Sequence, residues 1–137
     1  MAYLRVTSPK LLTFAELLVH DRLENHRQLL IYLKSLTPYK DEYIYIRDAY
    51  ERLQAKIKRD EQLIRFSINL VKSPRQRMLL TYRFLKGMRY EEISTSYPYS
   101  VRTLTDHIRT AIKHMAKLIV GNTSRYADLE EWEIRVS

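Results

Sequence analysis

The stretch RMLLTYRFLKGMRYEEISTSYPYSVRTLTDHIRTAIKHM, residues 77–115, decides the fold class of this chain. It contains an apolar segment that stops at Gly87, a short segment that opens with Glu91 and Glu92, and a longer segment with apolar residues at helical spacing. Glycine permits the left-handed conformation that ends many helices, and acidic side chains favour a helix N-terminus. The stretch therefore predicts three consecutive helices, of which the middle one is short.

The first of these helices has clear signals at both ends. Ser73 suits an N-cap, and Pro74 suits the first helical position. Gly87 follows Lys86, where a helix that ends needs a left-handed residue. We therefore expect this helix over about 74–86.

The last of the three helices carries one apolar face. Pro98 ends the short helix over about 90–96, and Ser100 caps the next helix, which is expected to run to Gly121. The positions predicted to face inward are Leu104, Ile108, Ala111, Ile112, Met115 and Leu118. The opposite face is left for solvent or for a partner.

Two long helices are predicted before this stretch. The first begins near Thr13, which forms a capping box with Glu16, and it ends before Pro38. The second runs from about Asp41 to Lys72. The seam of the first helix holds Leu12, Val19, Leu23, His26, Leu30 and Leu33. The seam of the second holds Tyr43, Ile46, Tyr50, Leu53, Ile57, Asp60, Ile64 and Val71.

These elements predict an all-α fold, in which a long N-terminal helical hairpin precedes a helix-turn-helix domain. We expect the hairpin over 1–60 to serve oligomerisation, a DNA-binding domain over 61–122, and an acidic C-terminal tail over 123–137. Residues 61–71 are apolar on more than one side and are expected to complete the C-terminal core. Trp132 in the tail packs on the body, mimics a partner strand or stays loose, and these alternatives remain open.

Composition excludes several classes of protein. The 137 residues include no Cys and only two Gly, which excludes disulfide frameworks and thiol nucleophiles and counts against phosphate-cradling loops. The four histidines have no spacing suited to one metal ion: His20, His26, His107 and His114. With no catalytic motif either, we expect no enzyme, cofactor or metal. Since no segment has the apolar run of a membrane span or signal peptide, we expect a cytoplasmic protein without membrane contact.

Positive charge is concentrated around the last three predicted helices. Residues 73–122 hold nine Lys or Arg and three Asp or Glu, whereas residues 1–72 hold 13 and 9. Such an excess is expected where a polyanion docks, and a solvated basic face is the alternative from charge alone.

A short helix, a brief break and a longer helix that opens with basic residues have the outline of a helix-turn-helix, whose second helix enters the major groove of DNA. Val101, Arg102 and Thr105 are expected to face outward there. Arg102 would reach a guanine, and Thr105 a thymine methyl or a phosphate. Asp106 reads a cytosine, caps a neighbouring Arg or repels phosphate. The expected phosphate contacts are Arg83, Lys86, Arg89, Arg109 and Lys113.

Residues 77–115 resemble the DNA-binding C-terminal domain of bacterial sigma factors. The match runs through Arg83, Phe84, Leu85, Gly87, Tyr90, Glu91, Glu92, Ile93, Ser100, Thr103 and Ala111. The resemblance implies that Arg102 and Thr105 reach bases and that Arg83 reaches a phosphate. It adds Ser100 and Thr103, which open the recognition helix, to the DNA-binding set. Tyr97-Pro98 stands where the family has Leu-Gly, and Asp106 where a basic residue is common.

The whole chain is similar in architecture to the ArpU-type late transcription regulators of phages and prophages of Gram-positive bacteria. That resemblance implies a sequence-specific, duplex-DNA-binding activator of structural, packaging or lysis genes. Two alternatives stay open, a sigma-like module whose main partner is RNA polymerase and a packaging factor similar to a small terminase subunit. The chain lacks the sigma domain that melts promoters, and small terminase subunits usually carry their DNA-binding part first.

The hairpin is expected to form a homodimer, because its apolar positions outnumber those that one partner helix covers. The additional positions are Leu17, Leu18, Leu29, Ile31, Leu36 and Ile44. A twofold dimer would present two recognition helices to half-sites ~34 Å apart. In the alternative, the hairpin folds back along its own domain and the protein is monomeric.

Overall fold

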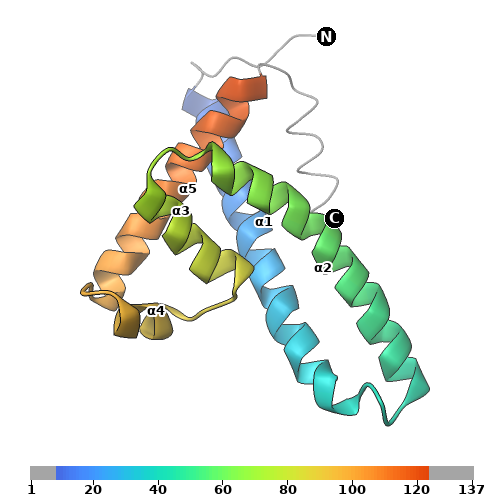
Figure 1. Cartoon of the computed structure of the whole chain (residues 1–137). Coiled ribbons are helices and arrows are strands. Elements are labelled where there is room, and N and C mark those ends of the chain that lie inside the picture. The colour runs from blue at the N-terminus through green and yellow to red at the C-terminus, as the bar shows by residue number, and fades with distance from the viewer. Residues whose placement is uncertain (1–8, 124–137) are drawn as a thin grey trace, which may run out of the picture.

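The computed structural model describes residues 9–123, and this part of the chain is all-α, with five α-helices and no strand (Figure 1). The helices are α1 (Pro9–Leu36), α2 (Ile44–Leu70), α3 (Pro74–Leu80), α4 (Tyr90–Ser96) and α5 (Val101–Thr123). A 3-10 turn, η1 (Thr37–Tyr39), follows α1, and a π-helical turn, η2 (Thr81–Leu85), follows α3. The predicted all-α fold class is confirmed. The acidic tail and Trp132 lie outside the described residues.

The two long helices form the predicted hairpin, and they contact each other. Helix α1 begins at Pro9, earlier than the expected Thr13, and proline is favoured in the first helical turn. Helix α2 begins at Ile44 rather than at Asp41, because residues after the 3-10 turn stay in tight turns that are closed by the amides of Glu42 and Tyr43 on the Tyr39 carbonyl.

Helix α1 lies between α2 and α5 and shares one hydrophobic core with both (Figure 1). It contributes the fully buried Ala15, Val19 and Leu23. The other members of this core include Ile64, Ile68, Val71, Leu79, Leu80, Phe84, Ile93, Leu104, Ile108, Ala111 and Met115. Residues 61–71 enter the C-terminal core as expected, through Ile64, Ile68 and Val71, but they do not complete it, because the N-terminal half of α1 contributes to it as well. The division of the chain at 60/61 stays a prediction.

The helix expected over 74–86 changes its winding near its end. Ser73 caps it as predicted, with its hydroxyl accepting the Gln76 amide at 3.3 Å. After Leu80 the chain widens into a π turn, in which the Lys86 amide donates to the Thr81 carbonyl, five residues back, at 3.0 Å. Gly87 then takes φ +69°, the left-handed conformation that the sequence predicts.

A buried ionic cluster lies between α1 and α2, within the two predicted seams. Arg22 Nη2 is 3.1 Å from Asp60 Oδ1, and both side chains are almost fully buried. Lys56 Nζ approaches the other Asp60 oxygen at 3.4 Å. His26 is buried beside them, and neither of its ring nitrogens has a hydrogen-bond partner among the described residues. Burial lowers the pKa of His26, against the opposing charges of Asp60 and Glu61.

Asp60→Asn should destabilise the protein by about 3–5 kcal/mol, because it leaves the Arg22 charge buried without its carboxylate. Urea unfolding followed by circular dichroism measures the change. The matched control is Asp48→Asn, which breaks the exposed pair with Arg52 and should cost less than about 1 kcal/mol. Equal losses in the two variants would contradict the structural role of the buried pair.

The His26 environment predicts that stability falls on acidification. The pKa of His26 is lowered in the folded state, so the unfolded chain takes up a proton first as the pH falls below the ordinary histidine value of 6.5. The free energy of unfolding should therefore decrease from pH 7 towards pH 5. His26→Leu should flatten this dependence, whereas the exposed His20→Gln should keep it. An unchanged slope in His26→Leu would assign the acid sensitivity to other groups.

Candidate nucleic-acid interface

Helices α4 and α5 and the turn over residues 97–100 form the predicted helix-turn-helix arrangement. The Ser100 hydroxyl caps α5 by accepting the Thr103 amide at 3.2 Å, and it also donates to the Thr103 hydroxyl at 3.0 Å. Inside the turn, Ser94 Oγ donates to the Tyr99 carbonyl at 2.9 Å. These bonds tie the end of α4 to the start of α5, so the angle between the two helices is set locally.

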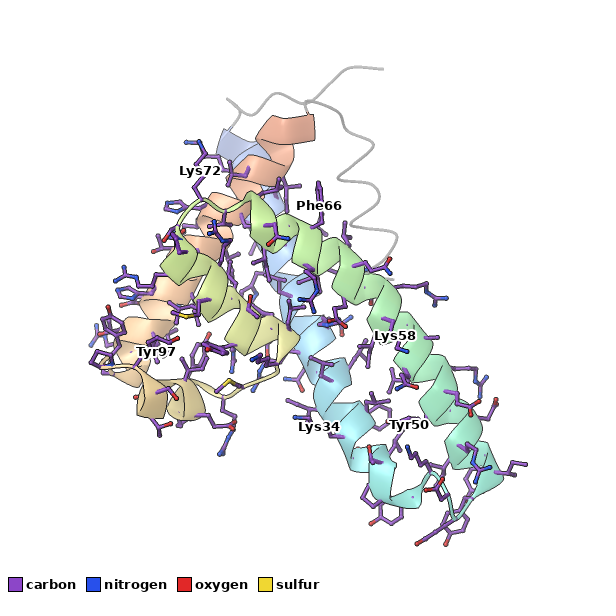
Figure 2. All side chains as sticks on the ribbon, viewed as in Figure 1. Lys34, Tyr50, Lys58, Phe66, Lys72 and Tyr97 are labelled. Carbon is purple, nitrogen blue, oxygen red and sulfur yellow. The ribbon has the colours of Figure 1, made fainter. Side chains whose placement is uncertain are left out.

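Tyr97, in the turn between α4 and α5, packs towards α3 and η2. Its ring lies 6.0 Å from the Tyr82 ring, centroid to centroid, and its hydroxyl is 2.7 Å from Met78 Sδ. Burial and the hydrogen bond with Tyr82 raise the pKa of the Tyr97 phenol. Figure 2 shows Tyr97 on the side of the molecule away from α2. The turn thus packs on the preceding helix through an aromatic contact instead of an aliphatic one.

Helix α5 presents the two faces that the sequence predicts. Leu104, Ile108 and Ala111 are fully buried. The expected outward positions comprise the exposed Val101, Arg102, Asp106, Arg109 and Lys113 and the half-buried Thr105. Lys117, which sequence reasoning did not include, is exposed one turn beyond Lys113.

Three basic side chains and one acidic side chain therefore share the outer face of α5 over its first four turns. Arg102, Arg109 and Lys113 are exposed at spacings of seven and four residues, which are neighbouring positions on a helix surface. Asp106 lies among them. The Thr105 hydroxyl bonds the Val101 carbonyl at 2.8 Å, which leaves the Thr105 methyl as the group available to a partner.

Arg83 is not part of this face. It is buried, its Nη1 donates to the Met88 carbonyl at 3.1 Å, and its Nη2 lies 3.8 Å from the Glu24 carboxylate. Its guanidinium carbon also lies 3.8 Å from the centre of the Tyr90 ring. Arg83 thus fastens α1 to the connection between η2 and α4, and its guanidinium is occupied by protein groups.

Lys86 and Arg89, the other two residues expected before α4, are exposed. The Arg89 amide and Nε both donate to Glu92 Oε1, at 3.0 and 3.2 Å, which holds the N-terminus of α4. These bonds lower the pKa of Glu92. Lys86 Nζ lies 5.0 Å from the centre of the Tyr82 ring and stays open to solvent. Both cations are available at the surface, whereas Glu91 and Glu92 occupy the first turn of α4 as predicted.

A cluster that the sequence did not predict joins α3 to the turn. Arg75 Nη1 donates to the Tyr99 hydroxyl at 3.0 Å, and the Tyr99 ring contacts His107 edge-on with 5.1 Å between centroids. On the same side, His114 Nδ1 pairs with Gln76 at 3.1 Å, and Lys72 and Lys117 line a surface pocket. The Arg75–Tyr99 and Gln76–His114 pairs join residues 24 and 38 positions apart, so local patterns carry no signal for these contacts.

Comparisons of the chain with models of protein families, with curated proteins and with solved structures find no match. Among the described residues, no cluster of three or more His, Asp or Glu side chains has the arrangement to hold a metal ion. No helix of residues 9–123 combines the length and apolar character needed to cross a membrane.

Arg83→Gln should destabilise the fold by about 1.5–3 kcal/mol, because the charge-assisted hydrogen bond to the Met88 carbonyl and the ion pair with Glu24 are lost. Arg102→Gln removes an exposed cation and should change stability by less than about 0.5 kcal/mol. Thermal unfolding of both variants measures the difference. A stable Arg83→Gln protein would mean that the buried guanidinium does not hold α1 against the α4 connection.

Proposed function

We propose that the chain is a sequence-specific, duplex-DNA-binding transcriptional regulator whose recognition helix is α5. The observation that carries the proposal is the outer face of α5, the second helix of the helix-turn-helix arrangement, where Arg102, Arg109 and Lys113 are exposed after the Ser100 cap. An α-helix fits the major groove of B-DNA, and the first turns of such a helix meet base edges.

The roles follow from position along α5. Arg102, in the first turn, would pair bidentately with a guanine, while Val101 and the Thr105 methyl would contact thymine methyls. Arg109 and Lys113 lie deeper along the helix and would contact phosphates. Ser100 and Thr103 bond each other at the N-cap, so their part is to hold the reading end of the helix. Asp106 would accept from a cytosine amino group or orient a neighbouring arginine.

Backbone contacts would come from both sides of α5. Lys86 and Arg89 precede α4, and both are exposed. Arg75 joins the set, because its bond to Tyr99 holds a cation beside the turn. Arg83 leaves the set, because its guanidinium is buried against Glu24 and Met88. It would act by holding α1 against the connection between η2 and α4.

The resemblance of residues 77–115 to the DNA-binding domain of sigma factors supports this assignment. The similarity in architecture to ArpU-type regulators supports a role in late gene activation in a phage or prophage. RNA polymerase is the second partner that a sigma-like domain implies. A polymerase-binding module without DNA affinity of its own and a packaging factor are the competing functions.

Arg102→Ala should weaken binding to the preferred site by about 1–3 kcal/mol and relax preference at one base pair. Lys113→Ala should weaken all duplexes alike and reduce the salt dependence of log Kd by about 0.9. A site selected from random duplex, measured by fluorescence anisotropy at several salt concentrations, provides both readouts. Lys58→Ala removes the same charge from an exposed position on α2 and is the matched control (Figure 2).

Three outcomes would contradict the proposal. Binding that does not respond to salt would exclude phosphate neutralisation by the α5 face. Equal losses for Arg102→Ala on selected and random duplex would exclude base reading by Arg102. Capture of the chain by RNA polymerase without measurable affinity for duplex would favour the polymerase-binding alternative.

A further inference from the structure

The far end of the α1–α2 hairpin carries exposed apolar side chains for which the proposed function has no use. Between residues 31 and 45 the exposed large apolar or aromatic residues are Ile31, Tyr32, Tyr39, Tyr43, Ile44 and Tyr45. We call Tyr39, Tyr43, Ile44 and Tyr45, which lie within seven residues, the tip patch. Ile44 is 82 % exposed and Tyr45 is 68 % exposed. Figure 1 shows this end of the hairpin projecting away from α3, α4 and α5.

Two residues of the tip patch are among the positions expected to drive association, Tyr43 in the seam of the second helix and Ile44 among the additional apolar positions, but most of the other positions are covered. Val19, Leu23 and Ile57 are buried, and Leu30, Leu33 and Leu53 are half-buried, within one copy of the chain. Of the additional apolar positions, Leu18, Leu29 and Leu36 are also half-buried. The seam that we expected to drive association is thus largely covered by the hairpin itself. Leu17 is 61 % exposed near the other end of α1, and the other predicted apolar positions that are exposed, Ile31, Tyr43 and Ile44, lie at and around the turn.

The turn that bears the tip patch is braced by its own side chains. Arg47 Nε donates to the Lys40 carbonyl at 3.3 Å, and Lys40 Nζ lies 4.7 Å from the centre of the Tyr50 ring. The Tyr43 and Tyr45 rings contact each other with 5.8 Å between centroids. A patch built in this way loses little conformational entropy on binding, and tyrosine is enriched at the centres of protein interfaces.

The distribution of charge along the chain indicates which kind of partner suits the tip patch. The whole chain carries a formal charge of +8, which opposes approach of two copies through most of the surface. Residues 31–53 are different, because they hold four basic and four acidic side chains. These are Lys34, Lys40, Arg47 and Arg52 with Asp41, Glu42, Asp48 and Glu51. A region with no net charge offers no net attraction to DNA and, unlike the rest of the basic surface, does not repel a second copy of itself.

We propose that the tip patch is a homotypic interface, at which the hairpin turn of one copy packs on the hairpin turn of a second copy around a twofold axis. Tyr39, Tyr43, Ile44 and Tyr45 form its apolar centre, and the mixed charges form its rim. The proposal is independent of DNA binding, since none of these residues belongs to the α5 face. Because the contact lies at the far ends of the two hairpins, the two α5 helices are carried on opposite sides of it.

Cross-linking through an introduced thiol tests the geometry directly, because the chain has no cysteine of its own. Ile44→Cys puts a single thiol in the tip patch, and Phe66→Cys puts one at a comparably exposed apolar position on α2, away from the turn (Figure 2). Under mild oxidation of the full chain without DNA, Ile44→Cys should form a covalent dimer at least about tenfold faster than Phe66→Cys. Equal rates, or faster cross-linking of Phe66→Cys, would overturn the proposal.

Sedimentation equilibrium of the unmodified chain gives an independent measure. The mass should rise from 16.5 kDa towards twice that value as concentration increases. Ile44→Glu should keep the chain at 16.5 kDa while preserving its helicity, because an acidic residue in the first turn of α2 suits the helix N-terminus. Phe66→Glu should associate like the unmodified chain. A chain that stays at 16.5 kDa up to about 100 µM, or an Ile44→Glu variant that still dimerises, would overturn the proposal, and neither result bears on DNA binding.

Discussion

Helix α1 must bury apolar surface against two neighbours at once, and the rest of the fold depends on that requirement. Ala15, Val19 and Leu23 pack into the core that holds α5, while Arg22 and His26 on the adjoining face meet α2 around Asp60. Packing of apolar side chains supplies most of the favourable free energy, and the buried ion pair sets which residues of α1 and α2 oppose each other. The helix-turn-helix is therefore mounted on the hairpin rather than joined to it by a linker.

The Arg83 contacts link α1 to the start of α4. Glu24 on α1, the Met88 carbonyl and the Tyr90 ring all contact one guanidinium. Tyr90 begins α4, and α4 packs on α5. A displacement of α1 at Glu24 would therefore shift α4, which packs on α5, whereas the distant end of the hairpin makes none of these contacts.

Local sequence patterns predicted much of this architecture, and the exceptions have identifiable physical causes. Ser73, Gly87 and Ser100 mark helix ends through interactions with nearby backbone, and the 3.6-residue period assigns Leu104 and Ile108 to the inner face of α5. The buried positions of Arg83 and of α1 within the C-terminal core depend on contacts between residues about sixty or more positions apart. No local period encodes such contacts, so an arginine that resembles a phosphate ligand in sequence became a packing residue in the fold. The same reason explains why the Arg75–Tyr99 pair was missed.

The π turn at Thr81–Leu85 has a consequence for how this segment is aligned with other helix-turn-helix proteins. A bond that spans five residues instead of four accommodates one additional residue in a helical turn without breaking the helix. A homologue with a regular α-helix in this position would therefore be one residue shorter between Thr81 and Gly87. An alignment without a gap there would shift every later position by one, which on a helix is a rotation of about 100°. Buried and exposed positions of α4 and α5 would then be misassigned.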